Sequence, residues 1–184
     1  NICTSQVLLA NMAGMYTVYH GPQGLRTIAE RIHRFTALFS TALINAGIDV
    51  LTTQAFDTVW VDFGEHATLV YHGALAGGYN LRQVDEGVLG FSFNETTTRD
   101  DVIALLTLTV GFPPDLDMAP IDTVCHGVLD TLRQQQPPLL PAELRRTDTI
   151  LTHPVFNRYH TEHEMLRYLK RLQNKDLALD HSMI

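Results

Sequence analysis

The sequence predicts an α+β fold in which helices pack on one small sheet. Apolar and polar residues alternate in residues 58–63 and again in residues 89–93, a period that is typical of strands with one buried face. Apolar residues at helical spacing precede, separate and follow these two segments. Helices and short strands interleaved in this order favour a helical layer over a sheet.

The chain begins with a predicted helix of residues 1–19, for which Thr4 or Ser5 is the candidate N-cap. Its large apolar residues cover more than one face: Val7, Leu8, Met12, Met15, Tyr16 and Tyr19. A helix of this kind is either buried on several sides or lies at an interface.

Gly21 and Pro22 end this helix, and Pro22 suits the first turn of the next one. The second helix carries a long apolar stripe, after which Gly47 is its expected end. The stripe consists of Leu25, Ile28, Ile32, Phe35, Phe39 and Leu43.

The middle of the chain contains the predicted sheet. Strands are expected at residues 58–63, 81–84 and 89–93, and Trp60 makes the second face of the first strand only partly polar. A helix of residues 67–75 lies between them. Thr97 or Thr98, with an aspartate three residues on, predicts the capped start of another helix, which ends at Gly111.

The C-terminal third is predicted to contain a helix, a linker and an arm. The helix carries Ile121, Val124, Val128 and Leu132, and residues 134–144 are a proline-rich linker. Pro154 favours extended backbone at His153, and Thr161 with Glu164 has capping-box spacing. The helix that follows has one narrow stripe, formed by Met165, Leu166, Leu169 and Leu172.

Composition limits the classes of function. The net charge of -7 argues against nucleic acid, whose partners usually carry a basic surface. Cys3 and Cys125 are the only cysteines, so we expect a reducing compartment rather than a disulfide framework. The sequence shows neither a membrane-spanning run nor a signal peptide. Because it opens at Asn1 within an apparent helix start, we expect a segment of a longer chain.

Two stretches closely resemble the P-protein of the glycine cleavage system, the pyridoxal phosphate (PLP) glycine decarboxylase. These are NICTSQVLLAN at residues 1–11 and the run from Leu151 to Tyr159 with its NKDLALDHSMI ending. In that family a PLGSCTMKLN run comes next. One mild departure is Asn94-Glu95, where the family often has Asp-Glu.

The resemblance implies that residues 1–133 form the small domain of the non-catalytic first half. This domain would be like the small C-terminal domain of aspartate-aminotransferase-like PLP enzymes, with helices on a small, mainly antiparallel sheet. It implies a linker at 134–148 and, at 149–184, the incomplete N-terminal arm of the catalytic half. The whole enzyme would decarboxylate glycine on PLP and pass the aminomethyl group to the lipoyl arm of H-protein. It would form a homodimer without a nucleic-acid or membrane partner, in the bacterial cytoplasm rather than a mitochondrial matrix.

The expected role of this segment is scaffold and interface, without a catalytic residue of its own. The resemblance places the PLP lysine beyond Ile184, and neither Lys170 nor Lys175 lies in the strand-and-glycine-loop setting that the aldimine uses. Candidate residues near the active site or between the halves are Asn1, Cys3, Thr4, Asn157, Arg158, Tyr159 and His160.

Other chemistries fit the sequence less well. His160, Glu162, His163 and Glu164 could hold zinc, but they lack the i, i+4 histidine pair of the helical zinc motif. Cys3 could be a nucleophile, yet a buried packing role is the simpler interpretation, and Cys125 falls on a core stripe. The alternative function is a free-standing protein-interaction domain with no activity.

Overall fold

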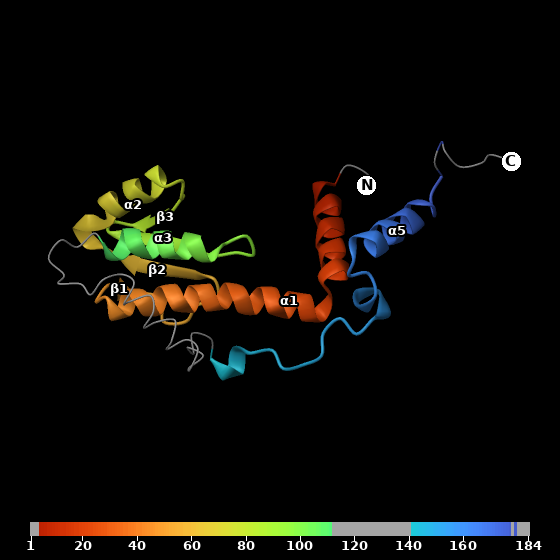
Figure 1. Cartoon of the computed structure of the whole chain (residues 1–184), viewed down its shortest axis with the longest axis horizontal. Coiled ribbons are helices and arrows are strands. Elements are labelled where there is room, and N and C mark those ends of the chain that lie inside the picture. Colours follow the sequence, from red (N-terminus) through yellow and green to blue (C-terminus); the bar gives the residue numbers. More distant parts are fainter. Residues whose placement is uncertain (1–3, 112–140, 178, 180–184) are drawn as a thin grey trace. The chain divides into compact units, whose positions relative to one another are not determined.

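The computed structural model describes residues 4–111, 141–177 and 179 (Figure 1). The chain divides into two compact units. Unit 1 combines Asn1–Ile28 with Thr147–Ile184, and unit 2 is Ala29–Arg146.

Unit 2 contains a four-stranded antiparallel sheet with the strand order β1-β2-β4-β3. Its strands are β1 (Asp49–Val50), β2 (Thr58–Asp62), β3 (Arg82–Asp85) and β4 (Val88–Ser92). The two central strands pair in a register that sets Val59 opposite Phe91 and Val61 opposite Leu89. Since side chains alternate between faces, this register places the largest apolar residues of both strands on one face.

Helices cover that face. They are the second part of α1 (Ser5–Asn45), α2 (Ala67–Ala76), which follows the 3₁₀ turn η1 (Gly64–His66), and α3 (Arg99–Val110) (Figure 1). The core lies between the two layers and includes Phe39, Leu43, Val59, Val61, Val70, Leu89, Phe91, Val102 and Leu106. This two-layer arrangement confirms the predicted α+β class.

The opposite face of the sheet has no such cover among the described residues. Trp60 lies there, directly opposite Gly90, and 43% of its surface is exposed. A Cβ on Gly90 would lie 3.5 Å from Cδ1 of the indole ring, an ordinary van der Waals contact. The expectation of a partly apolar second face at Trp60 is therefore confirmed.

The loop between β4 and α3 is closely tied to its surroundings. Thr98 and Asp101 form a capping box, in which Thr98 Oγ1 accepts from the Asp101 amide at 3.2 Å and Asp101 Oδ2 accepts from the Thr98 amide at 2.8 Å. These bonds from Thr98 lower the pKa of the Asp101 carboxyl group. Arg31 of α1 donates to the carbonyl oxygens of Glu95 and Thr97 at 3.1 and 2.8 Å. The loop is thus fixed to the helical layer.

Burial and the Asp101 carboxylate also change the pKa of Tyr79, which lies at the end of the turn after α2. Tyr79 donates its hydroxyl to Asp101 Oδ1 at 3.1 Å. Burial, and then this bond to a negative group, raise the pKa of the tyrosine. The cap of α3 therefore also holds the end of α2 in place.

Unit 1 is built from the first part of α1 and the C-terminal segment. α1 bends at Gly21, where the backbone leaves the helical region, so it consists of two helices joined at a kink. The C-terminal segment forms the 3₁₀ turn η3 (Pro154–Asn157) and the helix α5 (Glu162–Gln173). Thr161 Oγ1 accepts from the Glu164 amide at 3.3 Å, as the sequence predicted for the start of α5.

His153 is extended, as predicted, and Pro154 then occupies the first turn of η3, where its missing N–H has no partner to lose. The short strand β1 was not expected, since its two residues carry no alternating pattern.

Parts of the predicted organisation lie outside the described residues. These include the helix of residues 121–132, Cys125 and residues 134–140 of the linker; the rest of the linker contains the 3₁₀ turn η2 (Ala142–Leu144). The division at 133 and 148 stays a prediction, and the compact units differ from it by grouping the first helix with the C-terminal arm. Across the described ranges, no helix combines the length and hydropathy needed to cross a membrane.

Candidate functional site

The kink of α1 is a site of very close approach within unit 1. Gly21 is buried and has a φ of 62°, in the left-handed region that favours glycine. A Cβ at this position would lie 2.6 Å from the Phe156 carbonyl oxygen and 2.7 Å from Cε1 of His160. Both the backbone angle and the available space therefore require glycine at position 21.

His160 bonds to the same kink. Its Nδ1 lies 2.7 Å from the carbonyl oxygen of Tyr19. Because a carbonyl only accepts, Nδ1 carries the hydrogen and donates it. This bond ties the arm to the end of the first part of α1. We call Tyr19, Gly21, Phe156 and His160 the Gly21 joint.

Further hydrogen bonds hold the arm, one to the second helix and two within the arm itself. Arg26 donates from Nη2 to the carbonyl oxygen of Asp148 at 2.9 Å. Asn157 donates from Nδ2 to the carbonyl oxygens of Leu151 and His153, at 3.1 and 3.2 Å. Leu151 has a positive φ of 53°, a rare conformation for a branched side chain that the Asn157 bond helps to hold.

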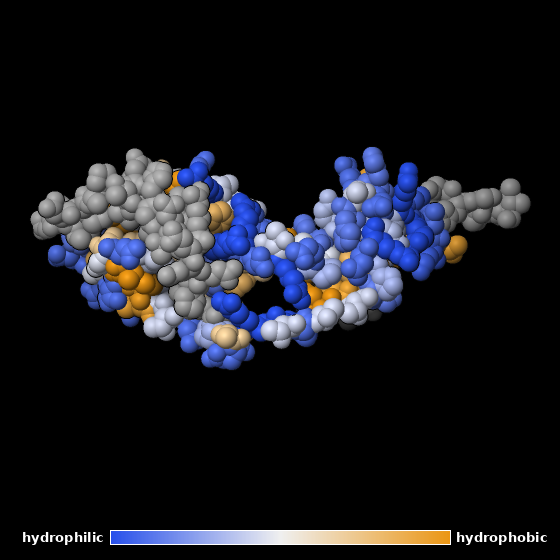
Figure 2. All heavy atoms as spheres, turned by 60° about the horizontal axis from the view of Figure 1, so that its bottom comes forward, coloured by the Kyte–Doolittle hydropathy of each residue, from blue (hydrophilic) through white to orange (hydrophobic). Residues whose placement is uncertain are grey.

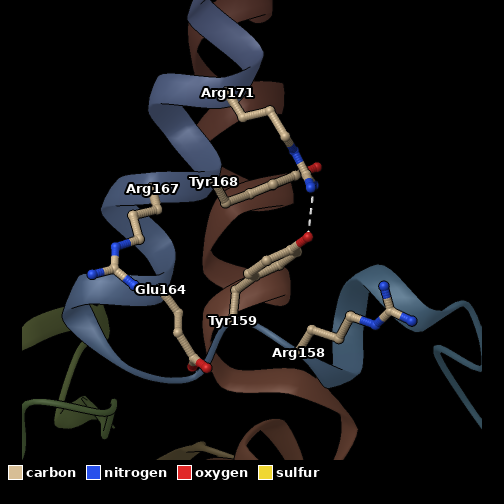
Figure 3. A pocket seen from close by; sticks show the side chains of 6 residues that line it. All are labelled: Arg158, Tyr159, Glu164, Arg167, Tyr168 and Arg171. Atoms are coloured by element: carbon tan, nitrogen blue, oxygen red, sulfur yellow. Dashed lines mark hydrogen bonds between the residues drawn. The ribbon is translucent and has the colours of Figure 1, made fainter.

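A second feature of unit 1 is an open pocket of about 430 Å³ on the arm (Figure 3). Tyr159 and Tyr168 stack there, with ring centroids 4.3 Å apart and planes 12° apart. Arg171 donates from Nη2 to the Tyr159 hydroxyl at 2.6 Å. The pocket is lined by Arg158, Tyr159, Glu164, Arg167, Tyr168 and Arg171.

The structure places the predicted interface residues in different settings. Asn157 fixes the arm internally, Arg158 and Tyr159 line the pocket, and His160 binds the kink. Thr4 is half-buried just before α1, and Asn1 and Cys3 lie outside the described residues. The interface role of the whole set stays a prediction.

Sequence reasoning missed other members of these sites. Gly21 was interpreted only as a helix breaker, although a Gly-Pro pair directly after an apolar helix is also a signal for a backbone position that other residues cannot adopt. Tyr168 and Arg171 were not predicted as site residues. Nothing in their spacing from Tyr159 indicates a stack, because the chain reverses direction between them.

The candidate metal ligands around His160 and the two lysines of the arm are exposed. No group of three or more His, Cys, Asp and Glu side chains gathers in the described part of the chain, and His160 Nδ1 is engaged by Tyr19. Lys170 lies on the exposed surface of α5 and Lys175 just beyond its end. An aldimine lysine needs an enclosed setting that orients the cofactor, so neither lysine fits that role.

The first part of α1 leaves an apolar face exposed. Leu8, Met12, Tyr16 and Tyr19 recur at the i, i+4, i+8 and i+11 spacing of one helical face, and each is exposed. Leu8 exposes 65% and Met12 59% of its surface. Val18, on a different face, is buried. Of the two alternatives for this helix, burial on several sides does not hold within the described residues.

The fold belongs to a recognisable class: an α+β domain with one helical layer over a small antiparallel sheet, consistent with a PLP enzyme of the aspartate-aminotransferase fold type. A family model described as "Glycine cleavage system P-protein" matches residues 1–109. The chain is 60% identical over 184 residues to a "Glycine dehydrogenase (decarboxylating)" of Dechloromonas aromatica.

Similar relatives with the same name come from other bacteria. That of Chromobacterium violaceum is 50% identical over 187 residues, and that of Shewanella amazonensis is 52% identical over 184. The alignments cover 100% of this chain but 18% of each of these relatives. The chain therefore belongs to the glycine cleavage system P-protein family and spans less than a fifth of the length of these relatives.

Proposed function

We propose that this chain is a segment of a glycine decarboxylase that acts on glycine with PLP and transfers the aminomethyl group to the lipoyl arm of H-protein. The names of the relatives and the family match support this assignment. Its class is an oxidoreductase, glycine dehydrogenase (aminomethyl-transferring). PLP would supply the electron sink for decarboxylation when bound in the whole enzyme, on a lysine beyond Ile184.

Within that enzyme, the segment is scaffold and interface. The observation that supports this role is the Gly21 joint. Tyr19 and Gly21 belong to the part that resembles the first half, and Phe156 and His160 belong to the part that resembles the start of the catalytic half. Contacts this close fix the direction in which the arm leaves the first helix. They would therefore also fix the position at which the catalytic half starts.

The partners and location follow from the same assignment. The exposed face of Leu8, Met12, Tyr16 and Tyr19 would pack on another part of the P-protein chain or on the second subunit of a homodimer. The bacterial source of the relatives supports a cytoplasmic location. Nucleic acid is not an expected partner, in line with the net charge of -7.

The experiment that tests this role uses the full-length enzyme with either Gly21→Ala or Gly14→Ala. Gly14 lies in the same helix, and a Cβ there would meet nothing within 4 Å. We expect Gly21→Ala to lower glycine decarboxylation, measured as release of labelled carbon dioxide, by about tenfold or more, since a misplaced scaffold can cost that much. Gly14→Ala should keep full activity.

Two outcomes would contradict the proposal. Undiminished activity in Gly21→Ala would show that the joint does not position the catalytic half. A full-length enzyme that retains PLP but releases no carbon dioxide from glycine would remove the assigned reaction and favour a binding role. Measuring the PLP content of each variant separates a lost cofactor from a misdirected arm.

A further inference from the structure

The pocket on the arm concentrates positive charge in an acidic chain. Three of its six lining residues are arginines and one is a glutamate, so its formal charge is +2 (3 − 1), whereas the whole chain carries -7. Arg167 and Arg171 lie one turn apart on α5, and Arg158 follows η3. A bound anion would offset this local positive charge.

One arginine of the pocket, Arg171, is held in place by its neighbours. The Arg171 guanidinium lies over the rings of Tyr159 and Tyr168, 5.6 and 5.2 Å from their centroids. Its Nη2 also donates to the Tyr159 hydroxyl at 2.6 Å. A guanidinium has five N–H donors, so this bond leaves most of them for another acceptor. A side chain fixed in this way loses little freedom when it binds a ligand.

The two flanking arginines have no internal acceptor. Among the residues that the structure describes, neither Arg158 nor Arg167 makes a hydrogen bond or an ion pair, and both are exposed. In the view of Figure 3, Arg158 and Arg171 lie on the side of the tyrosine pair where the Tyr159 hydroxyl points, and Arg167 extends to the other side. The surface of this part of the chain is mainly hydrophilic in Figure 2.

We propose that this pocket binds an oxyanion, a carboxylate or phosphate group, with Arg171 as its main donor and Arg158 beside it. Guanidinium groups match the planar carboxylate and the phosphate through paired N–H bonds. The stacked tyrosines are the apolar floor of the pocket, and Glu164 at its edge disfavours a ligand with several negative charges on that side. The pocket is distinct from the Gly21 joint, so the proposed scaffold role does not depend on it.

The test titrates the 184-residue chain with inorganic phosphate and, separately, with N-acetylglutamate. Ionic strength is held constant with sodium chloride, and the arginine side-chain N–H signals are followed by nuclear magnetic resonance. Saturable shifts of Arg171 and Arg158 are expected with at least one probe. Saturation by phosphate alone assigns the pocket to a phosphate group, and saturation by N-acetylglutamate alone assigns it to a carboxylate.

Two variants make the assignment specific. Arg171→Lys keeps the charge but loses the paired donors, and we expect about tenfold weaker binding. Tyr159→Phe keeps the ring and removes only the hydroxyl that places Arg171, and we expect about threefold weaker binding. Signals of α5 amides report whether the helix is intact in each variant.

Arg99, an exposed arginine in the first turn of α3, serves as the internal control. Shifts that are linear and equal at Arg99 and Arg171 would overturn the proposal, because they would indicate general screening of charge. Unchanged affinity in both Arg171→Lys and Tyr159→Phe would overturn it as well.

Discussion

Phe91 in unit 2 and Leu8 in unit 1 are both large apolar residues on regular secondary structure, yet their surroundings differ completely. Phe91 exposes 1% of its surface and packs against Phe39, with ring centroids 4.8 Å apart. Leu8 exposes 65%. Unit 2 buries a contiguous set of apolar residues between helices and sheet. The described part of unit 1 has no such core, and many of its apolar residues are exposed.

The difference shows that the units are stabilised in different ways. Unit 2 has a contiguous core, the largest source of stability in a folded domain. The described residues of unit 1 are held by the Gly21 joint and by hydrogen bonds at single points, and α5 has no buried residue. A unit of this kind depends on further apolar surface for its stability, as we propose for a segment of a larger enzyme.

The largest expected effect sharpens the comparison of the two units. Phe91→Ala should destabilise unit 2 by about 3–5 kcal/mol, because it removes a ring from a close-packed core and leaves a cavity. Met12→Ala, on the exposed face of α1, should change stability by less than about 0.5 kcal/mol. Urea denaturation of both variants measures the two effects. Equal losses would mean that the exposed face of α1 is in fact packed in solution.

The next effect concerns the joint. Gly21→Ala should destabilise unit 1 locally by about 1–3 kcal/mol, since alanine is strained at a φ of 62°. Gly14→Ala should instead stabilise α1 by about 0.5–1 kcal/mol, because alanine favours a helix interior. Hydrogen exchange of the backbone amides of residues 15–25 measures both changes. If exchange in Gly21→Ala stayed at the rate of the unmodified chain, the stabilising role of the joint would be contradicted.

The two helix caps give a matched pair of smaller effects. Thr98→Ala should cost unit 2 about 1 kcal/mol, because α3 loses its cap within a cooperative core. Thr161→Ala should leave the unfolding of unit 2 unchanged and increase exchange only in the first turn of α5. Chemical denaturation together with amide exchange distinguishes the two results. Destabilisation of unit 2 by Thr161→Ala would contradict the separation of the units.

The Thr98 cap also predicts that the stability of unit 2 depends on pH. The pKa of Asp101 is lower in the folded chain than its ordinary value of about 4. The stabilising contribution of this carboxylate is therefore complete above about pH 4 and is lost as the pH falls through the lowered folded pKa. Thr98→Ala should make unit 2 less sensitive to acid over this range, measured by thermal unfolding from pH 5 to pH 2. An unchanged acid dependence would assign the sensitivity to other carboxylates.

The smallest effect is expected in α5 by itself. An excised peptide of residues 161–173 should show little protection of its amides, since an isolated helix this short is marginal in water. In the whole chain, Met165, Tyr168 and Leu172 are half-buried and should protect the helix more strongly. If the peptide protects its amides as well as the chain does, α5 forms without help from the rest of unit 1.

Local chemistry made much of the secondary structure predictable. The alternation around Val59 and Phe91, the cap at Thr98 and the cap at Thr161 each place an element within one or two residues of its position in the structure. Such signals involve neighbours in the sequence, so they act whatever the rest of the chain does. The strand β1 and the turns η1, η2 and η3 were missed, because elements of two to four residues are too short to show a period.

The sequence by itself determined the family, the α+β class and the positions of the main helices and strands, since these depend on side-chain periodicity and on caps a few residues apart. The tertiary structure decided which residues meet. It brought His160 to the carbonyl oxygen of Tyr19, 141 residues away, and set Tyr168 on Tyr159. Contacts of this kind depend on where the chain turns and how closely two backbones approach, and neither is encoded in any short stretch of residues.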